Sequence, residues 1–96
     1  MSEVAVVAIF MAKPGKEEEL RQVLEANVGP TRQERGALQY DLHRDIEEPR
    51  RFIFVERWES KDALDAHGKS AHIQAFRAKS PELCEHGEVR VASKLL

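Results

Sequence analysis

Apolar and polar residues change their spacing several times along the chain, and each change marks a new element. The first pattern is a continuous apolar run, VAVVAIFM, over residues 4–11. It is short, partly β-branched and followed by the turn signal Lys13-Pro14-Gly15. A run of this kind predicts a strand that is buried on both faces.

Helical spacing follows in residues 16–28. Apolar side chains recur there every three or four residues, at Leu20, Val23, Leu24 and Val28. Glutamates fill the first turn, where acidic groups suit the helix dipole. Gly29-Pro30 should break or kink this helix. A further turn over residues 31–35 should end at Gly36, which suits a C-terminal cap.

In the next two segments apolar and polar residues alternate, which predicts a β-hairpin. In residues 37–44, Leu38, Tyr40 and Leu42 should share one face. A charged loop over residues 45–49 leads to a second strand, residues 51–59. The residues that should share one face of that strand are Phe52, Phe54, Glu56 and Trp58. The alternation does not fix the register of the hairpin, and a slip of one residue would reverse the faces of a strand.

A second helical region begins after Ser60, a good N-cap residue. Gly68 interrupts it, Ser70 can cap a new helix, and residues 71–79 continue at helical spacing. Pro81 should stop that helix. We expect a connection over residues 83–87 and a last strand over residues 88–95, where apolar and polar residues alternate.

The predicted order is β-α-β-β-α-β, which is that of the ferredoxin-like α+β fold, an antiparallel sheet with two helices on one face. The 96 residues suffice for one domain, which we take to span residues 1–96. In a lone domain of this kind the other face of the sheet meets water, yet the first and third predicted strands are apolar on both sides. We therefore expect a homodimer in which this second face packs against another copy.

Charge and cysteine content limit the classes of binding partner and the cellular compartment that we expect. The chain has 15 lysines and arginines against 17 aspartates and glutamates, a formal net charge of −2. This balance argues against nucleic acid or an anionic membrane as partner, because both favour a basic excess. No stretch approaches the ~20 apolar residues of a membrane span. The single cysteine, Cys84, excludes an internal disulfide and favours the cytoplasm.

Four separated segments occur in an order that resembles a known family. They are AKPGKEEEL at residues 12–20, YDLHRD at residues 40–45 with Pro49 after it, FVERWES at residues 54–60, and LDAHGKSAHIQAF at residues 64–76. Together they resemble the antibiotic biosynthesis monooxygenase family, and within it the small quinol-monooxygenase-like proteins. The resemblance runs from about residue 4 to residue 91.

The resemblance implies a dimeric α/β-barrel of two sheets packed face to face, with a pocket between the helices and the sheet of each subunit. It also implies the oxidation of a small quinol or hydroxylated aromatic by O2 without flavin, haem or metal. Similar proteins include isomerases of small signalling molecules and proteins without known activity. A non-redox isomerase and a non-enzymatic binding dimer therefore stay open as alternatives, since one fold hosts many functions.

Such a reaction needs a base, because a phenolate gives up electrons more readily than a phenol, and the base should titrate near the working pH. His67 is the candidate catalytic residue, because it follows Leu64 at helical spacing and histidine titrates nearest to neutral pH. In the family pattern AH-x4-H the first histidine tends to face the cavity. The alternative is a buried histidine satisfied by a neighbour.

His72 is a weaker, substrate-binding candidate. It lies five residues after His67, so the two need not share a helix face, and we expect no metal site from this pair. His43 lies with Asp41 on the second strand and should face either the pocket or the dimer interface. Some related enzymes place an asparagine on the first strand; this one has none, and Asn27 could supply the polar group instead.

Phe54 and Trp58 are candidate platforms for an aromatic ring, with core packing as the alternative. Glu56 lies between them and completes the candidate substrate-binding wall. A carboxylate in such a place either pairs with an arginine or has a raised pKa. We expect the pairing, and the candidate partners are Arg44, Arg51 and Arg57.

Overall fold

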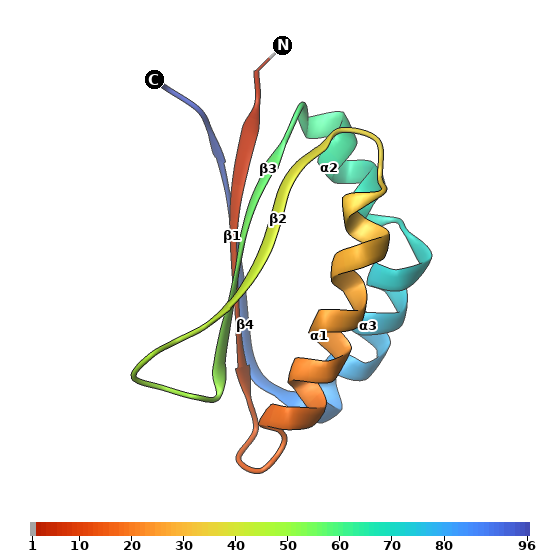
Figure 1. The fold of residues 1–96 in the computed structure, drawn as a ribbon. Coiled ribbons are helices and arrows are strands. Elements are labelled where there is room, and N and C mark those ends of the chain that lie inside the picture. Colours follow the sequence, from red (N-terminus) through yellow and green to blue (C-terminus); the bar gives the residue numbers. More distant parts are fainter. Residues whose placement is uncertain (1) are drawn as a thin grey trace.

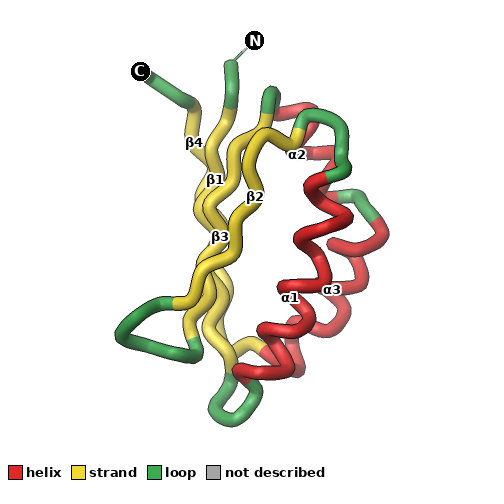
Figure 2. The backbone as a smooth tube through the Cα atoms, viewed as in Figure 1, coloured by secondary structure: helices red, strands yellow, loops and turns green. Residues whose placement is uncertain are grey.

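The computed structural model describes residues 2–96 as two layers, a four-stranded antiparallel sheet and three helices that cover one of its faces (Figures 1 and 2). The strand order is β2-β3-β1-β4. The elements are β1 Val4–Ala12, α1 Glu17–Arg32, β2 Ala37–Arg44, β3 Arg51–Trp58, α2 Lys61–Gly68, α3 Ala71–Leu83 and β4 Cys84–Ser93. The predicted ferredoxin-like fold is confirmed, with its second helix divided into α2 and α3.

Serine caps begin both parts of this divided helix. The Ser60 hydroxyl accepts a hydrogen bond from the Ala63 amide at 3.1 Å, and the Ser70 hydroxyl accepts one from the Ile73 amide at 3.4 Å. Each bond satisfies a backbone N–H that has no partner within the helix. The predicted interruption at Gly68 is confirmed, since α2 ends there and α3 begins at Ala71.

The helix end predicted at Pro81 was wrong, and of the break or kink predicted at Gly29-Pro30 the break does not occur. Helix α1 continues through Pro30 to Arg32, and α3 continues through Pro81 to Leu83, so that β4 begins at Cys84 without the expected connection. A proline lacks an N–H and crowds the carbonyl four residues before it, but the turn after it can still close, as in the bond from the Cys84 amide to the Ser80 carbonyl. Burial of Leu83 helps to hold the last turn of α3 in place.

A short turn, rather than a helix cap, contains Gly36. Helix α1 already ends at Arg32 with Gln33 as its C-cap, and Gly36 lies in the turn before β2 with a φ of +88°. The Ala37 amide donates to the Glu34 carbonyl within this turn at 3.2 Å. The turn places Glu34 between the end of α1 and the start of β2.

The hairpin register, which the sequence left open, contains a β-bulge. Ala37 pairs with Trp58 while Gln39 pairs with Arg57, so Leu38 is the extra residue. The predicted face shared by Leu38 and Tyr40 is therefore wrong: Leu38 is 47% exposed, whereas Tyr40 is buried opposite Glu56. A bulge shifts the alternation by one residue, which a strict period of two cannot reveal.

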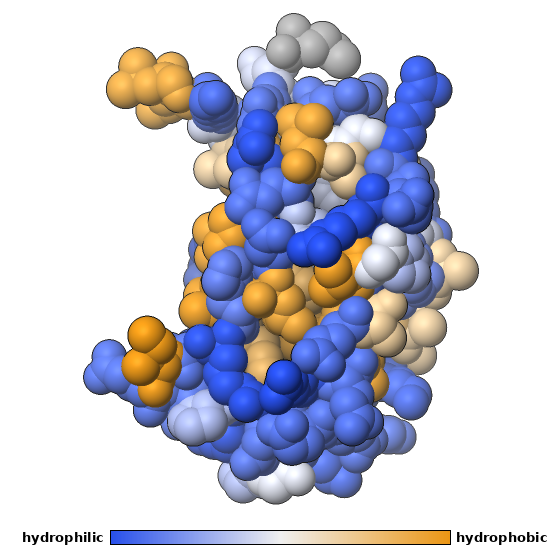
Figure 3. All heavy atoms as spheres, in the orientation of Figure 1, coloured by the Kyte–Doolittle hydropathy of each residue, from blue (hydrophilic) through white to orange (hydrophobic). Residues whose placement is uncertain are grey.

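The core lies between the sheet and the helices. Alternate residues of β3 face it as predicted, and Phe52, Phe54, Glu56 and Trp58 are all buried. The other face of the sheet remains open in the single chain, with Val7 42% and Val55 36% exposed, so β1 is buried on one face only. Apolar atoms also reach the surface along the margin of the sheet that faces away from the helices (Figure 3). None of the described helices has the length and apolar content that a membrane crossing needs.

Replacing Gly36 by alanine should destabilise the protein more than the same change at Gly15. Both glycines have positive φ, at +88° and +84°, which costs a residue with a Cβ about 1 kcal/mol. A Cβ at Gly36 would lie 2.6 Å from Ala63 Cβ, whereas at Gly15 it would meet nothing within 4 Å. We expect Gly36→Ala to lower the free energy of unfolding, measured with urea, by about 1–3 kcal/mol more than Gly15→Ala, since overpacking costs this much. Equal losses at the two sites would contradict the close packing of α2 on this turn.

Candidate functional site

A cavity of about 840 Å³ lies between the sheet and the helices. Its walls are mainly apolar and aromatic, and include Val6, Phe10, Leu24, Tyr40, Phe54, Leu64, Ile73 and Phe76. Val89 and Val91 of β4 also line it, although they are 52% and 47% exposed. The cavity therefore opens to solvent at the β4 edge of the sheet, and its size suits a small organic molecule.

The lining contains exposed or half-exposed polar residues, namely Lys61, Asp65, Lys69, Gln74, Arg77 and Ser80. Three further polar groups in it are buried and come from different elements. They are Asn27 of α1, Glu56 of β3 and His67 of α2, and all three side chains are buried. The expectation that Asn27 could supply a polar group is consistent with this position. Cavities that combine apolar walls with a few convergent polar groups are typical of binding and active sites.

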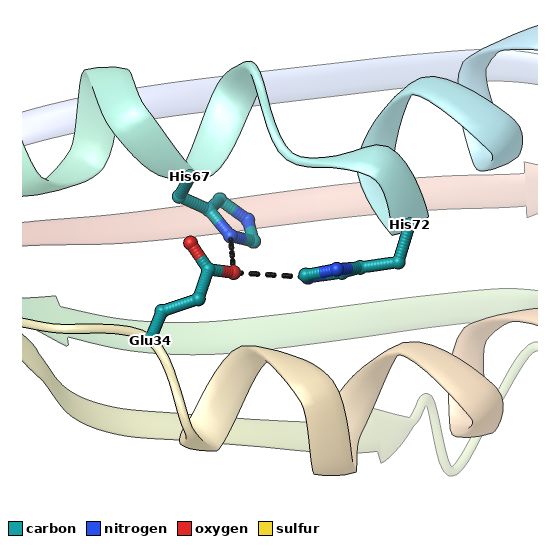
Figure 4. A group of neighbouring side chains, drawn as sticks. All are labelled: Glu34, His67 and His72. Carbon is teal, nitrogen blue, oxygen red and sulfur yellow. Dashed lines mark hydrogen bonds and ion pairs between the residues drawn. The ribbon is translucent and has the colours of Figure 1, made fainter.

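His67 is held by a carboxylate on the side away from the cavity. Its Nδ1 lies 2.7 Å from Oε2 of Glu34, and Nε2 of His72 lies 2.9 Å from the same oxygen (Figure 4). The hydroxyl of Thr31 also contacts His72 Nε2, at 3.0 Å. One carboxylate thus ties the turn after α1 to both sides of the α2–α3 junction.

This contact determines which nitrogen of His67 faces the cavity. Burial lowers the pKa of His67 from its ordinary value, while the contact with Glu34 partly opposes the shift. A carboxylate only accepts hydrogen bonds, so a neutral His67 places its single proton on Nδ1. Nε2 makes no hydrogen bond to the described residues, so it is the nitrogen left free to interact with a ligand in the cavity that His67 lines.

Glu56 is a buried acid without an arginine partner among the described residues, so the expected pairing was wrong. The three candidates pair elsewhere: Arg44 with Glu18, Arg51 with Asp45 and Arg57 with Glu3. These arginines cannot reach Glu56 because they lie outside the core, while Glu56 faces the helices. Its partner is Trp58, whose indole N–H donates to Oε1 at 2.9 Å. Burial raises the pKa of Glu56 to about 7, although the Trp58 hydrogen bond opposes this.

Aromatic rings surround His67 and Glu56. The His67 ring lies 4.7 Å from Trp58 and 5.5 Å from Tyr40, measured between ring centroids. Tyr40 stacks on Phe54 with 4.5 Å between centroids. Burial raises the pKa of Tyr40 well above its usual range, so its hydroxyl keeps its proton. These rings make the surroundings of the two titratable groups largely apolar.

Some of the site residues predicted from the sequence line the cavity, and the others do not. His67, Phe54 and Glu56 line the cavity. Trp58 is fully buried and contacts the site through Glu56 and His67, without lining the cavity itself. His72 contacts Glu34 behind His67, and exposed His43 lines a separate shallow groove beside Leu42 and Phe52.

Sequence reasoning missed Glu34 and Tyr40 as members of the site. The alternation did not show which face of the strand that carries Tyr40 points to the core, and the position of Tyr40 opposite Glu56 became known only with the register. Glu34 is 33 residues from His67 and lies in a turn. No local spacing links the two residues.

Comparison with known proteins identifies the family. The sequence profile of antibiotic biosynthesis monooxygenase matches residues 3–79. The chain belongs to the antibiotic biosynthesis monooxygenase family. Within curated proteins it is similar to "Putative monooxygenase Rv0793" of Mycobacterium tuberculosis, with 42% identity over 82 residues, 85% of this chain and 80% of the relative. It is also similar to "Putative monooxygenase YcnE" of Bacillus subtilis, with 35% identity over 83% of this chain and 84% of the relative.

Solved structures of this fold agree closely with the antibiotic biosynthesis monooxygenase assignment. The structure of Rv0793 from Mycobacterium tuberculosis has a TM-score of 0.94 at 38% identity, covering 99% of this chain and 97% of that chain. PA3566 from Pseudomonas aeruginosa has a TM-score of 0.95 at 31% identity, covering 100% of this chain and 97% of that chain. The family and its fold are therefore shown, and the names of the relatives support a monooxygenase-like role.

Replacing Glu56 by glutamine should change how stability depends on pH. The folded protein holds a proton on Glu56 up to about pH 7, whereas the unfolded chain releases it near 4.5. Folded chains therefore bind more protons between these values, and this contribution to stability is lost as the pH rises through 7. Relative to Glu56→Gln, the free energy of unfolding of the wild type, measured with urea, should fall by about 3 kcal/mol between pH 4.5 and pH 8. Parallel curves for the two proteins would contradict the buried, raised-pKa state of Glu56.

Proposed function

We propose that the protein is a cofactor-independent monooxygenase-like enzyme that oxidises a small quinol or hydroxylated aromatic with O2. The observation that carries the proposal is the His67 imidazole, held by Glu34 through Nδ1 and turned with Nε2 toward an aromatic-walled cavity. Membership in a family whose relatives bear monooxygenase names supports it.

In the proposed reaction, His67 Nε2 takes a phenolic proton from the substrate. The phenolate is electron-rich and transfers electrons to O2. One oxygen atom enters the ring, the other leaves as water, and the quinol becomes a hydroxyquinone. A neutral histidine suits this task because its lone pair is available near neutral pH. The apolar walls favour the reaction by keeping water away from the activated intermediate.

The cavity walls suit a flat aromatic substrate. Phe54 presents a ring that stacks on Tyr40, and Phe10 packs edge-on against Phe76 with 5.1 Å between centroids. Rings at such contacts offer both faces and edges to an aromatic guest. Asn27 supplies an amide that can hydrogen-bond a second hydroxyl or carbonyl of the substrate.

A non-redox isomerase is the second candidate. The imidazole of His67 and the carboxyl of Glu56, whose pKa burial raises to about 7, line the same cavity. An acid and a base at one site are the requirement for moving a proton between two positions of a substrate. The dependence on oxygen separates this reaction from the oxygenase.

We also propose that the protein is a homodimer in the cytoplasm. The open face of the sheet carries apolar side chains on adjacent β1 and β3, namely Ala5, Val7, Ile9, Met11, Ile53 and Val55. A contiguous apolar face of this kind is typical of an interface between subunits. The location rests on the lone Cys84, which suits a reducing compartment.

Substituting His67 should remove the catalytic base. We expect protein-dependent oxygen uptake with at least one member of a panel of hydroquinones and hydroxylated naphthalenes. His67→Ala should lower kcat by about 100-fold or more, since general-base catalysis contributes this much. His86→Ala is the matched control, because His86 is exposed on β4 outside the cavity. Turnover that continues without oxygen would favour the isomerase, and full activity of His67→Ala would contradict the assigned base.

A charge on the open face of the sheet should dissociate the dimer. We expect sedimentation equilibrium to give twice the 11.0 kDa mass of the chain for the wild type. Val7→Lys should shift the protein to the monomer, because a lysine would be buried against the partner without a counter-ion. Ala78→Lys, on the exposed side of α3, is the control and should leave the dimer intact. A wild-type monomer at micromolar concentration would contradict the proposed assembly.

A further inference from the structure

Two histidines and one carboxylate converge behind the wall of the cavity. One nitrogen each of His67 and His72 and one oxygen of Glu34 all lie within 4.8 Å of one another. They come from α2, α3 and the turn after α1 (Figure 4). We propose that Glu34, His67 and His72 form a binding site for a divalent transition-metal ion such as Zn²⁺.

The ligand types and their spacing suit this ion. Imidazole nitrogen and carboxylate oxygen are common zinc ligands, and bonds of about 2.0–2.2 Å place the donors of a tetrahedral site about 3.4 Å apart. The distances from Glu34 Oε2 to the two imidazole nitrogens are 2.7 and 2.9 Å. Small side-chain rotations that separate these atoms by about half an ångström would admit the ion.

The surroundings leave the carboxylate without a permanent cationic partner. Within the described residues, the groups that lie within ion-pair distance of Glu34 are His67 and His72. Neither histidine carries a permanent positive charge, whereas a divalent cation does. The Thr31 hydroxyl, which lies 3.0 Å from His72 Nε2 and is fully buried, provides a fourth oxygen beside the three ligands. A fourth ligand, from this hydroxyl or from water, would complete a tetrahedron.

The ion would lie outside the substrate cavity. His67 lines the cavity, but neither Glu34 nor His72 does, so the imidazole ring separates the ion from the substrate. An ion on Nδ1 leaves the single proton of the neutral ring on Nε2. His67 would then present an N–H donor to the cavity instead of a lone pair. This consequence rests on the proposed function and makes the metal an inhibitor of proton abstraction.

Metal binding is tested on the untagged wild-type protein, without any assay of activity. Calorimetric titration with Zn²⁺ should give one ion per chain, and Co²⁺ should give the visible absorption bands of a tetrahedral site. Glu34→Gln and His72→Asn should each weaken Zn²⁺ binding by about 100-fold, because each removes a ligand. His86→Asn is the control, since His86 and Glu88 form an exposed pair at 3.8 Å. Absence of binding, or binding that Glu34→Gln and His72→Asn leave unchanged, would overturn the proposal.

A second measurement uses only the wild-type protein, so it tests the site even if the variants fail to fold. With ¹⁵N-labelled histidine, one equivalent of Co²⁺ should shift or broaden the side-chain signals of His67 and His72 and leave those of His86 unchanged. Selective effects on His86 would overturn the site. An inhibition assay then tests the functional consequence: Zn²⁺ should suppress quinol oxidation. Binding without inhibition would count against His67 as the base and leave the metal site standing.

Discussion

The site depends on one carboxylate oxygen that contacts two imidazoles. Oε2 of Glu34 joins His67 Nδ1 and His72 Nε2, and so connects the turn after α1 with the junction of α2 and α3. Each partner is positioned by local chain geometry. The positive φ of Gly36 belongs to the turn that contains Glu34, and the caps at Ser60 and Ser70 begin the helices that carry the two histidines. Trp58 and Tyr40 pack against the His67 ring, and the contact with Glu34 engages its Nδ1.

The same carboxylate affects the electrostatics of the cavity wall. Burial raises the pKa of Glu56 to about 7, and the negative charge of Glu34 adds to that shift. Burial lowers the pKa of His67, and Glu34 opposes that change. Both shifts favour the neutral form of the side chain, since each charged form loses its hydration in the apolar interior. A neutral base and a neutral acid can therefore face one apolar space, an arrangement that suits proton transfer to or from an aromatic substrate.

Much of the fold could be predicted from the sequence because local physics determines it. Serine caps predicted the starts of α2 and α3, and a period of two predicted the inward face of β3. Predictions failed where tertiary contacts decide the outcome. Helices continue through Pro30 and Pro81, and the extra residue at Leu38 could be found only from strand pairing.

The candidate site was predictable only in part, because tertiary contacts also determine which residues form it. His67, Phe54 and Glu56 could be found from helical and strand periodicity, and all three line the cavity. The arginine partner expected for Glu56 was wrong, because a buried tryptophan donor takes that place. Glu34 could not be found, since the fold alone brings it to a histidine 33 residues away. Local sequence patterns thus do not reveal Glu34, the residue that holds the proton of His67 on Nδ1.

The central claim is that His67 keeps its proton on Nδ1 and offers a lone pair at Nε2 to the cavity. Long-range ¹H–¹⁵N correlation spectra of metal-free, histidine-labelled protein at pH 7.5 report the protonation of each ring nitrogen directly. The account predicts a protonated Nδ1 and an unprotonated Nε2 for His67. A proton on Nε2, or a doubly protonated ring at this pH, would contradict it.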